Sequence, residues 1–507
     1  MKASQIKIGA ILSYITIFVS LALSMLFTPI ILRTLGKNEY GLYNLVVSTV
    51  SYFNILNFGF NSAYIKYYSR YKVRGDEERV DKLNGLFFIV FSLIGLIALI
   101  IGLLIVFNAS TVFGNKLTKD EIDKAAVLMA ILVFNMSLTF LTTVFNLHVT
   151  ANERYIFQKT IMLVKTTINP LLMTGVLFLG FRSIGMVIAA TLLNIIYEMS
   201  MIVYCFKKLD MKFCFKNFDL GLMKEIIIFS SYIFFYLIVD QINLNANQFL
   251  IGRIKGAASV AVYGIAAQLY SHYMSISATM TNLFSPRINQ MVEKGESNKE
   301  ITFFFTRVSR VQFILLTLVL SGFLILGRPF INMWAGKGYE DAYIIVLLLI
   351  FPITFSLIQN IGIEIQKAKN MHKFRSRMYF TVAIFNVIIN IFLIKKFDII
   401  GAAAGNALAV IVGNIFLMNW YYHNKLKLDM KYFWKEIIYL FPALITSTVI
   451  GYVITLLLPV NGFKYLIIDG ILYVCVFVFI MYLMGMNTYE KNLLKKSIFL
   501  ITHKNKR

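Results

Sequence analysis

Long apolar stretches follow one another along almost the whole chain, and they restrict what it can fold into more than any other feature. An α-helix needs about 20 consecutive apolar residues to cross the hydrocarbon core of a bilayer. We delimit fourteen such stretches, at residues 10–32, 42–66, 84–107, 125–147, 161–180, 184–206, 224–250, 258–284, 303–327, 342–364, 378–394, 400–422, 436–458 and 464–486. The sequence therefore predicts an all-α integral membrane protein with about 14 transmembrane helices.

Charged residues make up only 15% of the chain, and most of them lie between the apolar stretches. Lys and Arg are concentrated in the loops that follow even-numbered helices, for example in SRYKVRGDEERVDKL and KAKNMHKFRSR, and at both ends of the chain. Because basic residues accumulate on the cytoplasmic side of membrane proteins, this pattern predicts that both termini are cytoplasmic. The same rule accounts for the net charge of +24 without a nucleic-acid partner. We expect the first helix to be retained, because no small-residue cleavage site follows it.

Residue types that carry catalysis or hold cofactors are sparse. The three Cys have no metal-ligand spacing, the five His are scattered, and no glycine motif for phosphate or dinucleotide binding is present. We therefore expect no cofactor and no metal. A membrane enzyme such as a polysaccharide polymerase would need a sizeable outer loop or a deep His with catalytic neighbours, and the sequence offers neither. We predict that the protein is not an enzyme.

Short segments of the first half of the chain recur in the second half. Three pairs match: EYGLYNLV at 39–46 with VYGIAAQL at 262–269, ANERYIFQ at 151–158 with AKNMHKFR at 368–375, and SIGMVIAAT at 183–191 with IIGAAAGNA at 399–407. Each pair is six predicted helices apart, which predicts two six-helix lobes related by a pseudo-two-fold axis along the membrane normal. The predicted parts are an N-terminal lobe at 1–208, a C-terminal lobe at 209–430, two further helices at 431–486 and a basic cytoplasmic tail at 487–507.

Two segments carry a resemblance to a known family. TPIILRTLGKNEYGLYNL, which ends the first helix, and LNFGFNSAYIKYYSRY, in the second, resemble the oligosaccharide flippases of bacterial polysaccharide export, which include the O-antigen or repeat-unit flippases. These share a superfamily with the lipid II flippases and the multidrug and toxic-compound extrusion transporters. The resemblance covers essentially the whole chain, and LGxxEYG is its most specific part. The chain departs from the family at Asn57, where an acidic residue is expected, so no role of that acid is carried over.

The resemblance implies a transporter that flips an undecaprenyl-diphosphate-linked oligosaccharide repeat unit across the bacterial cytoplasmic membrane by alternating access. The product would serve a cell-surface polysaccharide such as O-antigen or capsule. The implied partners are this lipid-linked substrate, membrane lipids, H⁺ or Na⁺ as a coupling ion, and other polysaccharide assembly proteins. A cation-coupled multidrug exporter of the same superfamily is the alternative function, and a positively charged central cavity would favour the lipid diphosphate instead.

Polar side chains form stripes on three of the predicted helices. Because polar groups that face lipid are costly, such stripes either line a water-filled cavity or join helices by hydrogen bonds. We predict a substrate cavity lined by Asn54, Asn57 and Asn61 of the second helix, Asp240, Asn243 and Asn247 of the seventh, and Gln268, His272 and Ser275 of the eighth. Amides both donate to and accept from sugar hydroxyls, which favours a carbohydrate over an apolar drug.

Several basic residues near helix ends are candidates for binding a diphosphate, although each could instead extend its charged end to the membrane surface. They are Arg33, Lys66, Arg70, Lys165, Arg253, Arg307 and Arg310. All except Arg33 and Arg253 are expected to ring the cytoplasmic mouth of the cavity. The candidates for ion coupling are three acids within the spans, Asp240, Glu198 and Glu364. Glu198 and Glu364 could alternatively pair with the basic residues.

Overall fold

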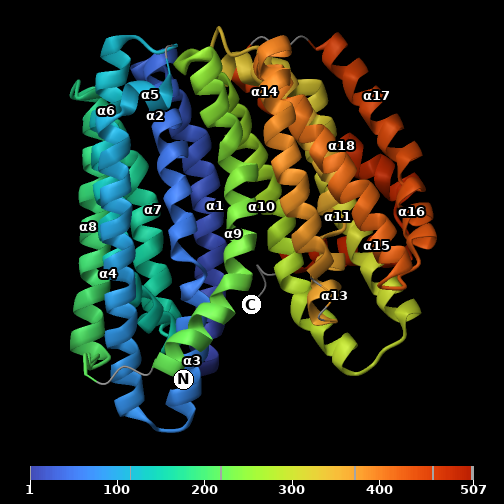
Figure 1. Ribbon diagram of the computed structural model, residues 1–507. Coiled ribbons are helices and arrows are strands. Elements are labelled where there is room, and N and C mark those ends of the chain that lie inside the picture. The colour runs from blue at the N-terminus through green and yellow to red at the C-terminus, as the bar shows by residue number, and fades with distance from the viewer. Residues whose placement is uncertain are drawn as a thin grey trace. The chain divides into compact units, whose positions relative to one another are not determined.

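The computed structural model describes residues 2–114, 116–216, 220–369, 371, 373–458 and 462–503. Within these residues every regular element is a helix, and no strand is present (Figure 1). Nine of the described helices are long and apolar enough to cross a membrane, or ten spans if the bent pair α12 (Asp341–Leu357) and α13 (Asn360–Ala368) is counted as one. The prediction of an all-α membrane protein is confirmed.

The chain divides into two compact units, residues 1–264 and residues 265–507. The helices of unit 1 are α1 (Lys2–Leu35), α2 (Lys37–Ser51), the 3-10 helix η1 (Tyr52–Asn57), α3 (Phe60–Val73), α4 (Glu77–Phe107), α5 (Ala109–Phe113), α6 (Lys119–Ala151), α7 (Tyr155–Phe178), α8 (Arg182–Lys208), α9 (Leu220–Lys255) and the start of α10 (Ala257–Glu293). The rest of α10 belongs to unit 2, with α11 (Asn298–Trp334), α12, α13, α14 (Lys373–Val410), the π-helix η2 (Ile411–Leu417), α15 (Met418–Asn424), α16 (Met430–Ile438), α17 (Phe441–Leu457), α18 (Phe463–Ile480), the π-helix η3 (Met481–Gly485) and α19 (Thr488–His503). The two units are defined by which parts of the chain contact each other. The lobe boundaries that the repeat predicts, after residues 208 and 430, are a separate matter and stay a prediction.

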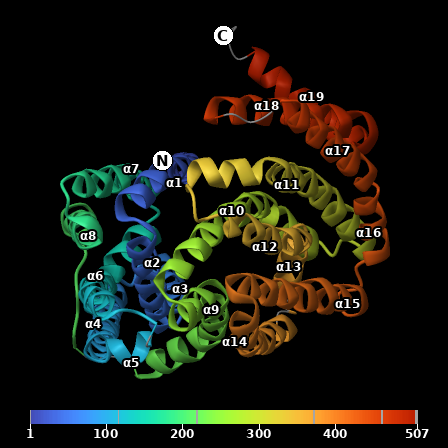
Figure 2. The ribbon, with the colours of Figure 1, turned by 90° about the horizontal axis from the view of Figure 1, so that it is seen from above.

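Unit 1 is built around α6, which packs along α4 and α8. Helix α7 packs along α8 and α1, so α4, α6, α8 and α7 form a row of neighbouring helices (Figure 2). Small residues permit close contacts in this row. Ser137 of α6 donates a 2.8 Å hydrogen bond to the carbonyl of Gly95 in α4, and a Cβ on Gly102 would lie 2.2 Å from Val133 Cγ1. Close packing of this kind is a main attraction between helices in a membrane.

Unit 2 is organised around α11, which contacts α12, α16, α17 and α18. The helix begins at a capping box in which the side chains of Ser297 and Glu300 each bond the other residue's backbone N–H. Buried hydroxyls fix its neighbours, since Tyr473 of α18 donates to Ser321 Oγ of α11 over 2.6 Å. Helix α14 packs along α12 and is interrupted by non-helical backbone at Phe397 and Asp398, where the sequence predicted a short connection.

Each predicted span falls on one to three described helices, and two spans that were predicted to be continuous are not. The second span was expected to be continuous over 42–66, whereas it breaks at Phe58 and Gly59, which have φ of 51° and 78°. A left-handed backbone costs about 1–2 kcal/mol for a residue with a side chain, so it is unusual at a phenylalanine. The apolar pattern around Phe58 therefore gave no reason to expect a break there. The tenth span bends by 42° between α12 and α13. Most of the segment predicted as a basic tail, Thr488–His503, is the helix α19, and its cytoplasmic location stays a prediction.

The LGKNEYG segment connects α1 to α2 and anchors two other helices. Gly36, with φ of 78°, separates α1 from α2. Glu39 is 7% exposed and accepts hydrogen bonds from the backbone N–H and the hydroxyl of Ser183, over 3.0 and 2.6 Å. Its carboxylate also lies 3.1 Å from Lys124 Nζ and from Arg182 Nη1. The acid of the motif therefore ties the start of α2 to the starts of α6 and α8.

The glycines of the two repeated Tyr-Gly segments, Gly41 and Gly264, both lie in close contacts where α2 meets the start of α10, within unit 1. A Cβ on Gly41 would lie 1.8 Å from the carbonyl oxygen of Ala257, which is backbone and cannot give way. A Cβ on Gly264 would lie 3.3 Å from the side-chain amide of Asn44, which needs only a small shift. Glycine is therefore required at Gly41 and merely favoured at Gly264.

Candidate functional site

A cluster of polar side chains, two of them buried and the others half-buried, lies among α6, α7 and α8 of unit 1. We call it the amide cluster. Its members are Asn135, Thr139 and Asn146 of α6, Lys165 of α7, and Asn194, Tyr197 and Glu198 of α8. All three helices are long and apolar enough to cross a membrane. Ionisable residues within such helices are rare and are costly unless they are paired, hydrated or protonated, so the cluster is the first candidate site.

The cationic side of the cluster is centred on Lys165. Its ammonium donates to Asn194 Oδ1 over 2.5 Å and lies 4.4 Å from the centre of the Tyr197 ring. The amide nitrogen of Asn194 donates in turn to Asn135 Oδ1 over 2.8 Å and to Thr139 Oγ1 over 3.0 Å. The charge of Lys165 is thus stabilised by an amide dipole and an aromatic face, and no described carboxylate contacts it directly.

The anionic side of the cluster is centred on Glu198, which is 5% exposed. Asn146 Nδ2 donates to Glu198 Oε2 over 2.8 Å, and Asn146 Oδ1 accepts from the Tyr197 hydroxyl over 3.1 Å. Lys165 and Glu198 interact electrostatically. The sequence identified both residues and allowed for their pairing, but it did not identify the asparagines of α6 that link them.

Beside the break in the second predicted span, two amide oxygens accept no hydrogen bond from the described residues. The Oδ1 atoms of Asn57 and Asn61 are buried, and neither accepts a hydrogen bond within the described residues. Asn54 is exposed, and its amide nitrogen donates over 3.0 Å to the carbonyl of Ser51, three residues earlier at the end of α2. Because η1 and α3 are separate helices, these three asparagines do not form the continuous stripe that was predicted.

The basic residues of α3 contact the start of α9, within unit 1. Lys66 Nζ lies 4.1 Å from the centre of the Phe229 ring. Arg70 Nη1 lies 3.9 Å from Glu225 Oε2, which also accepts from the Tyr67 hydroxyl over 3.1 Å. Both basic side chains are exposed, and exposed ion pairs of this length are weak. They stay candidates for binding an anion.

Two further cationic candidates lie at the opposite end of unit 1. Arg33 ends α1 and Arg253 lies in the last turn of α9, and both are exposed. Arg253 packs against Gly114, where a Cβ would lie 3.2 Å from Arg253 Cγ. The structure does not bring them into the amide cluster, and their proposed role at a diphosphate stays a prediction.

The predicted cavity wall of α9 and α10 is described only in part. The side chains of Asp240 and Asn243 lie outside the described residues. Asn247 is 4% exposed and donates to the Tyr263 hydroxyl over 2.9 Å, so it joins α9 to α10. On α10, Gln268, His272 and Ser275 are half-buried, and Ser275 donates to the carbonyl of Ser271 over 2.9 Å. For Asn247 the structure favours helix joining over the cavity.

Arg310 does not contribute to an open cationic ring, which corrects our expectation. It is 2% exposed, and its guanidinium bonds Glu490 Oε1 and Oε2 over 2.7 and 3.1 Å. It also bonds Glu436 Oε2 over 3.2 Å and the carbonyls of Glu436 and Gly485 over 2.6 and 3.0 Å. The reason is the helix α19, which brings Glu490 onto α11. Arg307 also contacts α19, since its guanidinium carbon lies 3.9 Å from the centre of the Tyr489 ring.

Glu364, the remaining acid, lies on α13. It accepts from the Ser285 hydroxyl over 2.7 Å and from Lys367 Nζ over 2.8 Å. Lys367 lies three residues after Glu364 on the same helix, and its side chain is 58% exposed. Glu364 is therefore paired at the surface of unit 2, in contrast to the buried Glu198.

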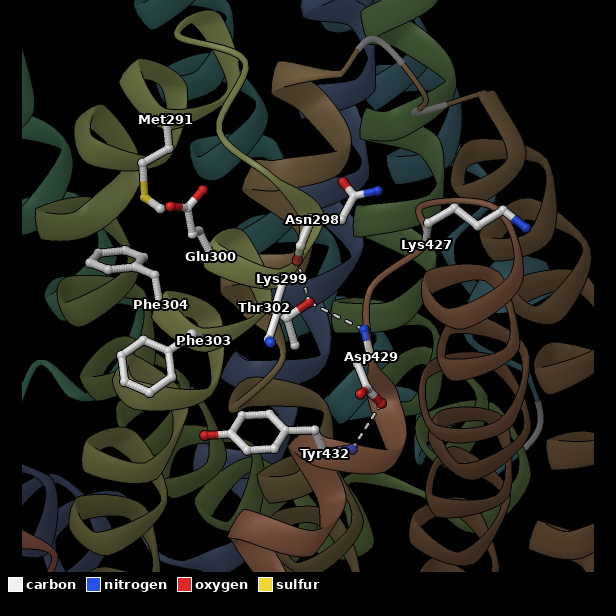
Figure 3. A pocket seen from close by; sticks show the side chains of 10 residues that line it. All are labelled: Met291, Asn298, Lys299, Glu300, Thr302, Phe303, Phe304, Lys427, Asp429 and Tyr432. Atoms are coloured by element: carbon white, nitrogen blue, oxygen red, sulfur yellow. Dashed lines mark hydrogen bonds between the residues drawn. The ribbon is translucent and has the colours of Figure 1, made fainter.

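Unit 2 also contains a pocket of about 740 Å³. Its lining is Met291, Asn298, Lys299, Glu300, Thr302, Phe303, Phe304, Lys427, Asp429 and Tyr432 (Figure 3). The two acids are used as helix caps, since Asp429 accepts from the backbone N–H of Tyr432 over 3.0 Å and Glu300 belongs to the capping box of α11. The aromatic rings gather on one side, and Lys427 extends away from them. None of the residues predicted for substrate or ion binding lines this pocket.

Comparison with known proteins gives consistent matches. Residues 8–292, more than half of the chain, match a family described as polysaccharide biosynthesis protein. A protein of Shigella flexneri named "Putative O-antigen transporter" is 20% identical over 403 residues, which cover 77% of this chain and 91% of that protein. The "Uncharacterized membrane protein EpsK" of Bacillus subtilis is 24% identical over 361 residues, covering 66% and 68% of the two chains.

Solved structures share the fold. The lipid II flippase MurJ, in an inward closed conformation, superposes with a TM-score of 0.74 at 15% identity, over 96% of this chain and 99% of that chain. An inward-facing multidrug resistance transporter of the MATE family gives a TM-score of 0.58 at 13% identity, over 79% and 97%. These matches confirm the resemblance to the oligosaccharide flippases, and the chain belongs to the polysaccharide biosynthesis protein family.

Proposed function

We propose that this protein flips an undecaprenyl-diphosphate-linked oligosaccharide repeat unit across the bacterial cytoplasmic membrane, from inner to outer leaflet, for a cell-surface polysaccharide. The observation that carries the proposal is the family match over residues 8–292 in a chain of membrane-crossing helices. The relative named as an O-antigen transporter and the fold shared with a lipid II flippase support it. We further propose that both termini are cytoplasmic, as the loop charges predict.

The chemistry of the substrate explains why such a protein is needed. Sugar hydroxyls cannot enter hydrocarbon unaided, because each unpaired polar group costs several kcal/mol there. A polar passage through the protein removes this cost, while the lipid tail stays in the bilayer. We propose an alternating-access cycle in which the site is exposed to one side of the membrane at a time. The amide oxygens of Asn57 and Asn61, which accept no hydrogen bond within the described residues, are suited to sugar hydroxyls.

Two energy sources are consistent with this reaction. An anionic substrate that moves outward gains about 2.3 kcal/mol per net charge for each 100 mV of membrane potential. Counter-transport of H⁺ or Na⁺ would add to this, with Glu198, Asp240 and Glu364 as candidate coupling residues. The proposed cycle involves no catalysis by the protein, and other polysaccharide assembly proteins would supply and consume the lipid-linked unit.

Deletion of the gene tests the proposal. We expect lipid-linked oligosaccharide to accumulate in the inner leaflet of the deletion strain and the surface polysaccharide to be lost. Expression of the wild-type chain should restore both, and a variant that is truncated within unit 1 should restore neither. Unchanged polysaccharide together with new sensitivity to cationic drugs would contradict the proposal and favour a multidrug exporter.

A further inference from the structure

We propose that the amide cluster is a proton-binding site, in which Glu198 takes up the coupling proton, and that it is not a sodium site. The inference rests on the proposed function for its role in transport, and it specifies the ion and the residue that binds it. It starts from an observation within unit 1 alone: the buried carboxylate of Glu198 and the half-buried ammonium of Lys165 are linked by amides and a tyrosine, and the described residues show no direct ion pair between them.

The carboxylate of Glu198 has a defined environment. The Asn146 amide is fixed in orientation, because its nitrogen donates to Glu198 Oε2 and its oxygen accepts from the Tyr197 hydroxyl. The charged and titratable groups that face Glu198 within the described residues are Lys165 from α7 and Tyr197 from its own helix, and α6 contributes the neutral Asn146 and Thr142. Lys165 is thus the one cation whose charge balances that of Glu198 in this environment.

The donors and acceptors of the cluster favour a proton over an alkali or divalent cation. A hard cation needs a shell of several oxygen ligands. Here the side-chain oxygens of Asn194 and Asn135 already accept hydrogen bonds, from Lys165 and from the Asn194 amide. The Lys165 ammonium occupies the place beside Asn194 Oδ1 that a bound cation would need. A proton requires only one lone pair of the Glu198 carboxylate. No group of three His, Cys, Asp or Glu suited to a metal occurs among the described residues.

Proton uptake would switch the cluster between two charge states. With Glu198 ionised, the charges of Lys165 and Glu198 cancel. With Glu198 protonated, Lys165 becomes an unbalanced cation in a membrane-crossing unit, which is unfavourable unless it gains an anion or water. The proton moves onto a carboxylate oxygen and leaves to solvent from the same oxygen, so no covalent bond other than O–H changes. Two states that differ by one charge are what coupling to a proton gradient requires.

Infrared difference spectroscopy tests the site without the substrate. The full chain is reconstituted in nanodiscs, and the carbonyl band of protonated carboxyl groups is recorded while the pH is lowered. We expect one such band to vanish in Glu198→Gln and to persist in Glu364→Gln, the matched control. Addition of Na⁺ in place of K⁺ at constant pH should leave the band unchanged. Loss of the band on Na⁺ addition, or its absence from the wild type, would overturn the proposal.

A second variant tests the part played by the ammonium. Lys165→Met removes the balancing charge, so the proton affinity of Glu198 should rise about tenfold or more, and the band should appear at a higher pH. An unchanged titration would show that the two groups are not coupled and would refute the switch.

The spectroscopic outcome is independent of the identity of the substrate. In vesicles, flipping of an undecaprenyl-diphosphate-linked disaccharide probe should depend on a pH gradient in the wild type and lose that dependence in Glu198→Gln. If the probe is not flipped at all while Glu198 still titrates, the proposed function fails and the proton site stands. If the probe is flipped normally by Glu198→Gln with its gradient dependence intact, the coupling role fails and the proposed function stands.

Discussion

Lys165 in unit 1 and Arg310 in unit 2 are both basic residues within helices that are apolar enough to cross a membrane, but the protein binds them in different ways. A guanidinium has five N–H donors, and those of Arg310 meet two carboxylates and two backbone carbonyls. Lys165 is half-buried, and its described contacts are one amide oxygen and one aromatic ring. Arg310 therefore has no donor left for a ligand, whereas Lys165 still has donors to offer.

The comparison separates a cation that holds helices together from one that can change partners. A saturated buried network fixes one arrangement, because removal of any member leaves charges or polar atoms unpaired. A cation that is balanced only at a distance can adopt a second arrangement when its counter-charge is neutralised. Location within a span does not distinguish these cases, but the number and charge of the contacts does.

The largest effect is expected for Arg310→Ala. It leaves the buried Glu490 and the partly buried Glu436 without a cation, which should lower the free energy of unfolding by about 3–5 kcal/mol. Thermal unfolding in detergent and the amount of protein in the membrane measure this. Arg310→Lys should recover only part of the stability, because an ammonium cannot make the bidentate contact. A normally abundant Arg310→Ala protein with a specific loss of transport would reverse the assignment and make Arg310 a substrate residue.

A smaller loss is expected for Lys165→Met, because Glu198 can then take up a proton and become neutral. We expect the free energy of unfolding to fall by about 1–3 kcal/mol near neutral pH, the usual range for a buried polar group left unsatisfied. The double variant Lys165→Met/Glu198→Gln should be more stable than the single variant Lys165→Met. The parallel double variant Arg310→Met/Glu490→Gln should not show this recovery, since Glu436 and the Gly485 carbonyl stay unpaired. Equal recovery in both pairs would remove the distinction between the two cations.

Glu198→Gln should lower the free energy of unfolding by only about 1 kcal/mol, since the amide keeps the size of the side chain and its bond to Asn146, and the half-buried Lys165 that loses its counter-charge can gain water. Transport that is driven by a pH gradient should fall at least about tenfold, as expected for a proton-coupling group. Chemical denaturation and the vesicle flipping assay are measured on the same preparation. Strong destabilisation would contradict the coupling role and show that Glu198, like Glu490, mainly holds helices together.

The smallest effect is expected for Arg307→Ala. Its described contacts are cation–π contacts with Phe303 and Tyr489, at 5.2 and 3.9 Å, and together they are worth about 0.5–1 kcal/mol, because the longer one contributes little. Thermal unfolding should therefore change little, and Arg307→Lys should behave like the wild type. A loss as large as that of Arg310→Ala would show that the docking of α19 depends on both arginines.

The sequence predicted the membrane helices because apolar length is a local property, and it identified Glu198 and Lys165 because ionisable residues stand out in apolar spans. It did not reveal the asparagines of α6 as their link, because these are common polar residues on another helix. Arg310 was misassigned because its partner Glu490 is 180 residues away, in a segment that was expected to be a tail. The break at Phe58 and the anchoring role of Glu39 depend on backbone conformation and distant helix ends, which periodicity does not encode.

The surroundings of the two glycines in the Tyr-Gly segments have a consequence for the substitutions that each position can accept. At Gly41 any side chain would meet the backbone of Ala257, so it would push the start of α10 away from α2. At Gly264 a methyl group would meet only the side chain of Asn44, which can move by a few tenths of an ångström. Sequence variation should therefore be tolerated at Gly264 as alanine and be excluded at Gly41, although both glycines stand in the same short motif.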